Sequence, residues 1–346
     1  MLEKHFISKQ SIINSLNDFY GIKVHTLTFL PLGADRNALV YKADTQDKSY
    51  FIKLKKGRQD DIFIVIMNLL YNAGVQQLIL PITTIHGQSI HHMDSISLIV
   101  YPFIVGNNGF NQVLTQEQWL ILGTALRKLH EIDVPISIQL RLRQETYSPK
   151  WRDSVRSLYA HLHTERIGDS VSLKLQKLMK ENAEAIHRLV NRAEQLAEKL
   201  QHDSPQFVLC HSDIHGGNVL IDQHNFIYIV DWDAPMMAPK ERDLMFIGGG
   251  VANVWNKPHE EEAFYKGYGK AEVNRTILAY YRHERIVEDI ALFGESLILS
   301  TSGSTESRLE SYNHFKAMFE PRGVVEIAFE TDKTINVCIK GNTEGL

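Results

Sequence analysis

The alternation of apolar and polar residues in the first hundred positions predicts a small β-rich region. Residues 49–54, SYFIKL, alternate with the period of two that a half-buried strand requires. That period places Lys53 on one face of the strand with Phe51, and the neighbouring apolar residues on the other. Similar patterns predict a helix over 9–19, two strands flanking a turn at 33–38, a helix over 60–74 ended by Gly74, and strands at 78–85 and 95–104.

Longer helical patterns dominate from residue 110 onward. Thr115 and Gln118 have the spacing of a capping box, and the apolar residues that follow recur three or four positions apart. Apolar residues keep helical spacing from 171 to 200, which predicts one helix about 40 Å long at ~1.5 Å per residue. Residues 207–233 interrupt the helices with two short strands. Helices resume to about residue 320, and the last fifteen or so residues are expected to fray.

These patterns together predict an α+β protein with two lobes. A small N-terminal lobe is expected at 1–100, a hinge at 101–109, and a large helical lobe at 110–346 that contains a helical insert at 140–205. Small ligands commonly bind in a cleft between two such lobes. The functional residues are therefore expected where the two lobes meet.

Composition and charge are those of an ordinary soluble globular protein. Hydrophobic residues make up 44% and charged residues 23% of the chain, and the net charge of −4 argues against a nucleic-acid partner. Two cysteines, Cys210 and Cys338, are too few for a disulfide framework. The N-terminal residues lack an apolar signal-peptide core, and no apolar run is long enough to span a bilayer. We expect a reduced, cytoplasmic protein with no membrane partner and no obligate protein partner.

The candidate chemistry lies at the ends of the two short strands, in FVLCHSDIHGGNVLI and IYIVDWD. Asn218 lies five residues after Asp213, and Asp231 lies thirteen residues further on. Phosphoryl transfer needs a carboxylate that orients the attacking hydroxyl and oxygen ligands for Mg²⁺, and these residue types supply both. The spacing therefore indicates a kinase-like site.

The same residues are also compatible with two different roles. His211 and His215 flank Asp213 in an H-x-D-x-H pattern that could bind zinc in a metal-dependent hydrolase, and Asp213 could simply cap a turn. The sequence contains neither GxGxxG nor GxxxxGK[ST], which excludes a Rossmann or P-loop nucleotide site.

HSDIHGGN followed by IVDWD resembles the aminoglycoside phosphotransferases, which are small-molecule relatives of the protein kinases. The resemblance covers nearly the whole chain. The longer segments at 148–153, 238–260 and 280–297 are most similar to the members of that family that phosphorylate spectinomycin. The resemblance implies a protein-kinase-like fold, ATP as co-substrate, Mg²⁺ as cofactor, and inactivation of a small cationic antibiotic at the 9-hydroxyl of spectinomycin.

The resemblance also implies roles for particular residues. Asp213 would orient the substrate hydroxyl or accept its proton, while Asn218 and Asp231 would hold Mg²⁺. Nucleotide contacts would come from Lys53 on the α- and β-phosphates, from Gly33 and Asn37 in the turn above the nucleotide, and from Tyr101 and Phe103 beside the adenine. Asp243, in ERDL, would brace the catalytic loop. An acid from the helix after Lys53 would pair with it; no acid has a clear position there, and the nearest are Asp60 and Asp61.

Carboxylates along the 280–297 segment are candidates for binding the protonated amines of such a substrate. Glu284, Glu288 and Glu295 fall within about 40° on a helical wheel. A charged stripe is more often plain solvent-exposed surface. Asp289 is a further candidate, and Trp255 could stack on the substrate or be a buried core residue.

Two other classes of function share the short motifs. A related small-molecule kinase could act on choline, ethanolamine, methylthioribose or homoserine, which a substrate panel scored by ADP release would reveal. The chain could instead be a metal-dependent hydrolase or an idle nucleotide-binding protein. Tightly bound zinc would favour the hydrolase, and Mg·ATP binding without turnover would favour the idle protein.

Overall fold

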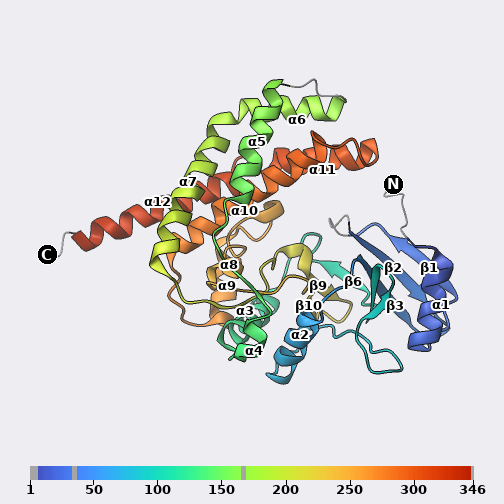
Figure 1. The fold of residues 1–346 in the computed structure, drawn as a ribbon. Coiled ribbons are helices and arrows are strands. Elements are labelled where there is room, and N and C mark those ends of the chain that lie inside the picture. The colour runs from blue at the N-terminus through green and yellow to red at the C-terminus, as the bar shows by residue number, and fades with distance from the viewer. Residues whose placement is uncertain (1–6, 33–36, 165–168, 344–346) are drawn as a thin grey trace.

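The computed structural model describes residues 7–32, 37–164 and 169–343, whose arrangement is shown in Figure 1. A five-stranded antiparallel sheet with the order β1-β2-β3-β5-β4 forms the N-terminal part, and long helices form most of the remainder (Figure 1). The strands are β1 (Thr26–Leu30), β2 (Ala38–Asp44), β3 (Ser49–Lys56), β4 (His91–Met93) and β5 (Ile96–Pro102).

The central strand β3 carries the predicted alternation of faces. Ile52 and Leu54 are fully buried in a core that they share with α1 (Lys9–Tyr20). Lys53 pairs in register with Val40 of β2 and Ile99 of β5, and its side chain points to the opposite face. The predicted strand and its two faces are confirmed, and they direct Lys53 away from the α1 side of the sheet.

The connection between β3 and β5 differs in part from the prediction. Helix α2 spans Ile62–Asn72, and Gly74 follows it with a φ of 81°, as expected for a glycine just beyond a helix C-terminus. The predicted strand at 78–85 is wrong, because within the described residues this stretch forms only isolated bridges, at Leu78 and Ile82. Pro81 lies between them and has no N–H for a ladder.

The C-terminal part is mostly helical, and its first long helix begins as predicted. Thr115 and Gln118 form the capping box of α3 (Gln116–Glu131). The other helices are α4 (Ile136–Gln139), α5 (Lys150–Thr164), α6 (Ser170–Glu181), α7 (Ala183–Asp203), α8 (Glu241–Leu244), α9 (Pro258–Tyr268), α10 (Arg275–Leu297), α11 (Thr305–Ala317) and α12 (Val324–Thr343).

The single long helix predicted over 171–200 is wrong, because the chain breaks at Asn182 into α6 and α7. Asn182 has a φ of −104° and a ψ of 16°, and its side-chain amide donates to the carbonyl of Leu178 at 2.9 Å. This local hydrogen bond gives the chain an alternative to continued helix. The apolar periodicity continues across the break because both helices contribute to one core.

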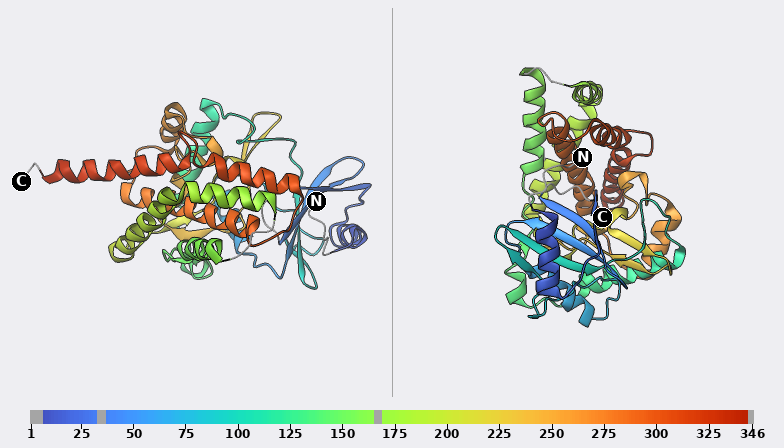
Figure 2. Two further views of the ribbon diagram at one scale, coloured as in Figure 1. Left: turned by 90° about the horizontal axis from the view of Figure 1, so that it is seen from above. Right: turned by 90° about the vertical axis from the view of Figure 1, so that its right-hand side faces the viewer.

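The expectation that the chain frays at its end is also wrong for the described residues, since α12 extends to Thr343. Val324, Val325 and Ala328 anchor the start of α12 in the core around α10. Figure 2 shows α12 projecting from the body at the end opposite the N-terminal sheet.

Two small sheets bring the predicted site segments together. One has the order β10-β9-β6 and the other β7-β11-β8. Their strands are β6 (Gly106–Asn108), β7 (Arg143–Gln144), β8 (Val208–Cys210), β9 (Val219–Asp222), β10 (Ile227–Ile229) and β11 (Met236–Ala238). The antiparallel pair β9–β10 is the hairpin that the sequence predicts in this region.

The three largest hydrophobic cores of the described residues hold the elements together, and a small fourth one surrounds Cys210. One lies between the sheet and α1, one lies among α5, α6, α7, α10, α11 and α12, and the largest joins α2 and Ile99 to α3, α9 and the β9–β10 hairpin. The largest core fixes the sheet relative to the hairpin. The lobe boundaries at 100 and 110 stay predictions. Within the described part of the chain, no helix has the length and apolar character needed to cross a membrane.

Candidate active site

The loop after β8 is held by a buried carboxylate. Asp243, on α8, is fully buried and accepts the backbone N–H groups of His211 at 2.9 Å and Ser212 at 2.7 Å. Ser212 has a φ of 75°, a left-handed conformation that is uncommon for serine and needs support from its surroundings. The bracing geometry predicted for Asp243 is therefore present.

Asp243 is supported in turn by His130 of α3. His130 Nε2 lies 3.1 Å from Asp243 Oδ2, and its Nδ1 lies 2.7 Å from the hydroxyl of Tyr268. Burial disfavours the ionised form of Asp243, but the contacts with His130 and the loop N–H groups outweigh it and lower the pKa of the carboxyl. Asp243 therefore contacts the loop after β8 as an ionised carboxylate.

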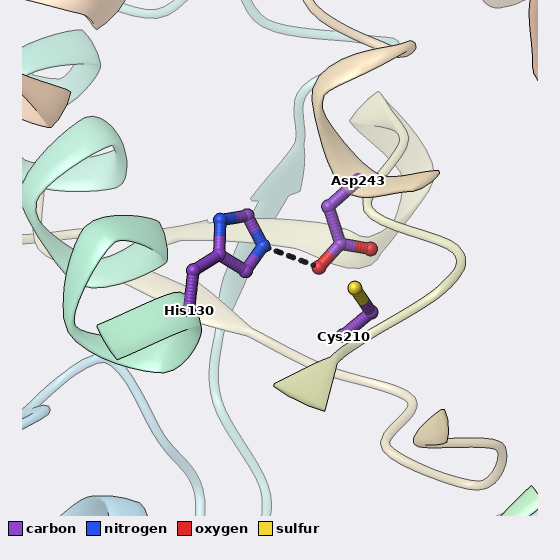
Figure 3. Close-up of side chains that lie close together, drawn as sticks. All are labelled: His130, Cys210 and Asp243. Carbon is purple, nitrogen blue, oxygen red and sulfur yellow. Dashed lines mark hydrogen bonds and ion pairs between the residues drawn. The ribbon is translucent and has the colours of Figure 1, made fainter. Parts of the chain in front are cut away.

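Figure 3 shows that Cys210 completes a buried trio with His130 and Asp243. Their potential ligand atoms lie within 4.8 Å of one another, which is close enough for a metal ion. Each atom already has a protein partner, however, and Cys210 Sγ contacts the carbonyls of Ala238 and Pro239 at 3.6 Å. We assign the trio to support of the loop, because a metal would have to displace these bonds.

Asp213 lies in this loop with its carboxylate contacted on both oxygens. Arg285 Nη1 donates to Oδ1 at 2.6 Å, while Oδ2 lies 3.4 Å from Asn218 Nδ2 and 3.5 Å from His215 Nε2. Burial raises the pKa of Asp213, but the contacts with His215 and Arg285 outweigh burial and hold the pKa well below its usual range. The side chain is 41% exposed, so an ionised carboxylate is open to a substrate.

Asn218 connects Asp213 to the strand that precedes Asp231. Its Nδ2 donates to the backbone carbonyl of Asp213 at 2.9 Å, and its own backbone carbonyl accepts the N–H of Val230 at 2.9 Å. Because Nδ2 is engaged in this way, Oδ1 is the atom of Asn218 available as a metal ligand. The structure therefore brings Asp213, Asn218 and the end of β10 together.

Asp231 faces Lys53 across the two parts of the molecule. Lys53 Nζ lies 2.7 Å from Asp231 Oδ1 and 2.7 Å from Asp233 Oδ2, and Lys55 Nζ also lies 2.7 Å from Asp233. Burial disfavours the charge on Lys53, but the two carboxylates outweigh it and raise the pKa of the ammonium. Asp60 and Asp61, which directly precede α2, instead contact Arg141.

The other described residues that are predicted to contact the nucleotide lie in or next to β2 and β5. Asn37 directly precedes β2, and Gly33 lies outside the described residues. Tyr101 packs edge-to-face on Phe51, with 6.3 Å between the ring centroids. Phe103 donates its N–H to the carbonyl of Ser49 at 3.1 Å. Their roles in nucleotide binding stay predictions.

The residues predicted to contact the substrate do not share one surface. Glu284 is only 6% exposed and accepts a bond from Arg152 Nη1 at 2.5 Å, and Trp255, 5% exposed, packs on Trp119. Burial raises the pKa of Glu284 to about 7, although Arg152 acts in the opposite direction. Asp289 accepts a bond from Arg285 Nε at 3.0 Å.

Two further acids of the predicted stripe differ from Glu284 in exposure. Glu288 is half-buried and lies near the charges of Arg242 and Arg285, whereas Glu295 is exposed. The roles of all these residues in substrate binding stay predictions.

Sequence reasoning missed Arg285, which touches the central carboxylate of the site. Its only sequence signal is its place four residues before Asp289, a spacing that normally indicates an ordinary helix-surface ion pair. Sequence reasoning also missed Asp233 as a second partner of Lys53. Both contacts depend on residues far apart in the sequence.

The chain is similar in sequence and structure to known phosphotransferases. The family model described as "Phosphotransferase enzyme family" matches residues 28–281. A crystal structure of spectinomycin phosphotransferase APH(9)-Ia in complex with ADP and spectinomycin is 52% identical, with a TM-score of 0.89, over 95% of this chain and 99% of that chain. The AMP-bound complex of APH(9)-Ia is 50% identical, with a TM-score of 0.84, over 93% and 98% of the two chains.

A more distant structure shares the fold alone. An aminoglycoside phosphotransferase from Alicyclobacillus acidocaldarius is 13% identical with a TM-score of 0.58, over 99% of this chain and 98% of that chain. No curated protein sequence matches the chain.

Proposed function

The chain belongs to the phosphotransferase enzyme family, and we propose that within this family it transfers the γ-phosphoryl group of ATP to a hydroxyl of spectinomycin. Its protein-kinase-like α+β fold, predicted from the sequence, is confirmed. The observation that carries the proposal is the meeting of Asp213, Asn218 and Asp231 at the β9–β10 hairpin, in a chain 52% identical to a protein whose crystal structure holds ADP and spectinomycin. The acceptor oxygen we propose is the 9-hydroxyl.

Asp213 would act on the acceptor hydroxyl. An ionised carboxylate can accept a hydrogen bond from the hydroxyl, aim its oxygen at the γ-phosphorus, and take the proton as the new P–O bond forms and the β,γ-bridging P–O bond breaks. The transition state of phosphoryl transfer is loose and asks little of a base, so positioning contributes more than basicity. The lowered pKa of Asp213 suits this role, because the carboxylate stays ionised at neutral pH.

The oxygen atoms around Asn218 fit a magnesium ion. Asn218 Oδ1 and the carboxylate of Asp231 are hard oxygen ligands of the kind that Mg²⁺ prefers, and Asp231 is 47% exposed. These two residues would hold the ion, which supplies charge neutralisation for the transferring phosphoryl group. Lys53, whose ammonium group forms ion pairs with Asp231 and Asp233 at this end of the hairpin, would contact the α- and β-phosphates of ATP.

The acceptor side of the site carries the charge that a cationic drug requires. Asp213, Glu288 and Asp289 lie around Arg285 beside the catalytic loop. Each contact between a carboxylate and a substrate ammonium in a partly wet site contributes on the order of 1 kcal/mol, so several must act together. Because ATP is the co-substrate, the proposed place of action is the cytoplasm, and the proposed biological role is antibiotic resistance.

The purified enzyme with Mg·ATP tests this proposal through ADP release on a panel of acceptors. We expect turnover on spectinomycin to exceed that on choline, ethanolamine, methylthioribose and homoserine, and ³¹P–¹H NMR of the product to place the ester at the 9-position. Preference for another acceptor would replace spectinomycin with that substrate. ADP release on no acceptor, with Mg·ATP bound, would indicate an idle nucleotide-binding protein.

A further inference from the structure

Arg285 of α10 bridges the catalytic loop and its own helix. Its Nη1 donates to Asp213 Oδ1 at 2.6 Å and its Nε donates to Asp289 Oδ1 at 3.0 Å. The guanidinium also lies 5.4 Å from the ring centroid of Phe246, and the side chain is only 17% exposed. Three groups thus hold one cation in a fixed place against the proposed catalytic carboxylate.

The backbone and the side chain of the loop are held by different elements. Asp243 fixes the backbone through the N–H groups of His211 and Ser212, but it does not touch the Asp213 side chain. On that side chain, Oδ2 has only long contacts, at 3.4 and 3.5 Å, whereas Oδ1 has the short bond to Arg285. The rotamer of Asp213 therefore depends mainly on α10.

A guanidinium suits this task better than an ammonium. Its donors lie in one rigid plane, so fixing Nε on Asp289 also fixes the direction in which Nη1 points. A lysine could reach one of the two carboxylates but could not transmit orientation from one to the other. The Asp289–Arg285–Asp213 chain therefore fixes the position of Oδ1 of the catalytic carboxylate.

We propose that Arg285 is a positioning residue for phosphoryl transfer, which orients the carboxylate of Asp213 toward the acceptor hydroxyl from the helix that also carries the acceptor-side acids. This inference rests on the proposed kinase function and adds to it a residue that need not touch either substrate. A plain structural ion pair accounts for the geometry less well, because a pair with a carboxylate as exposed as that of Asp213 contributes little to stability.

The test compares Arg285→Ala, Arg285→Gln and Arg285→Lys with a matched control, Arg192→Ala. Arg192, on α7, also donates through Nε and a terminal nitrogen, and its acceptor is Asp332 on α12. The side chain of Arg192 is 29% exposed and that of Asp332 is 18% exposed. We expect Arg285→Ala and Arg285→Gln to lower kcat about 10- to 100-fold, as misplacement of a reacting group by about 1 Å does. The KM for ATP should not change, and Arg192→Ala should keep the kcat of the wild type.

Two further measurements separate positioning from folding. Arg285→Lys should recover part of the lost kcat, and millimolar guanidinium added to Arg285→Ala should restore turnover without changing the thermal midpoint. A kcat near that of the wild type in both Arg285→Ala and Arg285→Gln overturns the proposal. Equal losses of kcat in Arg192→Ala and Arg285→Ala overturn it as well, since the effect would then follow stability alone.

Failure of the proposed function would be visible first in the wild-type enzyme. If the wild type does not phosphorylate spectinomycin, that function is overturned, and the same variants are then compared by ADP release with water as the acceptor. A 10- to 100-fold loss in Arg285→Gln would still support positioning by Arg285. An unchanged rate of ATP hydrolysis would overturn it.

Discussion

Replacing Asp243 by asparagine tests whether a buried brace that contacts no substrate sets the rate of the reaction. Asparagine has the shape of aspartate, but one of its two side-chain oxygens becomes an NH₂ group. In the structure both oxygens of Asp243 accept backbone N–H groups, from His211 at 2.9 Å and from Ser212 at 2.7 Å. Asp243→Asn must therefore leave one of these N–H groups facing another donor.

The cost follows from the number and kind of bonds changed. A hydrogen bond to a charged group contributes about 1.5–3 kcal/mol, and a buried donor left unsatisfied costs about 1–3 kcal/mol. The two values cannot simply be added, because both partly count the loss of the same hydrogen bond. We therefore expect Asp243→Asn to lower the free energy of unfolding by about 2–4 kcal/mol. Ser212, which needs the brace to keep its φ of 75°, directly precedes Asp213, so the loop should shift where the carboxylate is held. A shift of about 1 Å corresponds to a loss of about 10²-fold in kcat.

Asp169 provides a matched control far from the site. It caps α6 by accepting the N–H groups of Val171 at 2.9 Å and Ser172 at 2.8 Å, and it pairs with Arg308 at 2.7 Å. Asp169→Asn should lower stability in urea unfolding and leave kcat unchanged, whereas Asp243→Asn should lower both. A kcat for Asp243→Asn close to that of the wild type, with the stability loss present, would refute the reasoning that the brace positions the loop.

Four other substitutions test the remaining assignments. Asp213→Asn should lower kcat by roughly 10² or more while calorimetry shows unchanged Mg·ATP binding, and turnover near that of the wild type would remove its catalytic role. Asp231→Ala should abolish Mg²⁺-dependent binding of ATP, and an unchanged titration would contradict its assignment as a ligand. Glu288→Gln should raise the acceptor KM several-fold, in line with a lost contact of about 1 kcal/mol, and equal effects on the KM for ATP would argue for a general disturbance. Glu284→Gln should leave both KM values unchanged and alter the pH dependence of stability instead. The pKa of Glu284 is about 7 in the native state and near its ordinary value of 4.5 in the unfolded state. Between these pH values the native state binds more protons than the unfolded state, so the free energy of unfolding falls by about 3 kcal/mol as the pH rises from 4.5 to 7. This fall should disappear in Glu284→Gln, and its persistence would assign the pH dependence to another group.

The parts of the fold and site that the sequence predicted are those determined by local spacing. The strand alternation around Lys53 and the capping box of α3 involve residues within a few positions of one another, and both have the predicted geometry. The close spacing of Asp213 and Asn218 brings these two residues into contact, while their roles stay predictions. The brace by Asp243 was available only through family resemblance, because 30 residues separate it from Asp213 in the sequence.

Predictions failed where a distant or competing contact decided the outcome. Helical periodicity predicted one helix over 171–200, but the backbone leaves the helical conformation at Asn182 while the periodicity continues. For Lys53 the following helix offered no clearly placed acid, and the sheet turns Lys53 toward the hairpin, where it pairs with Asp231. Neither outcome leaves a pattern in the local sequence.

Neighbouring residues of helix α10 contact different parts of the molecule. Successive residues of a helix point about 100° apart, so Glu284 faces Arg152 of α5 while Arg285 faces the catalytic loop. The stripe predicted from the helical wheel groups acids that differ in burial, because angle alone does not say which of them the core covers. Because α10 is both part of a hydrophobic core and a wall of the proposed acceptor site, a substitution on it can change affinity through folding as easily as through contact with the drug. Assigning a residue of α10 to substrate recognition therefore requires its effect on stability to be measured beside its effect on KM.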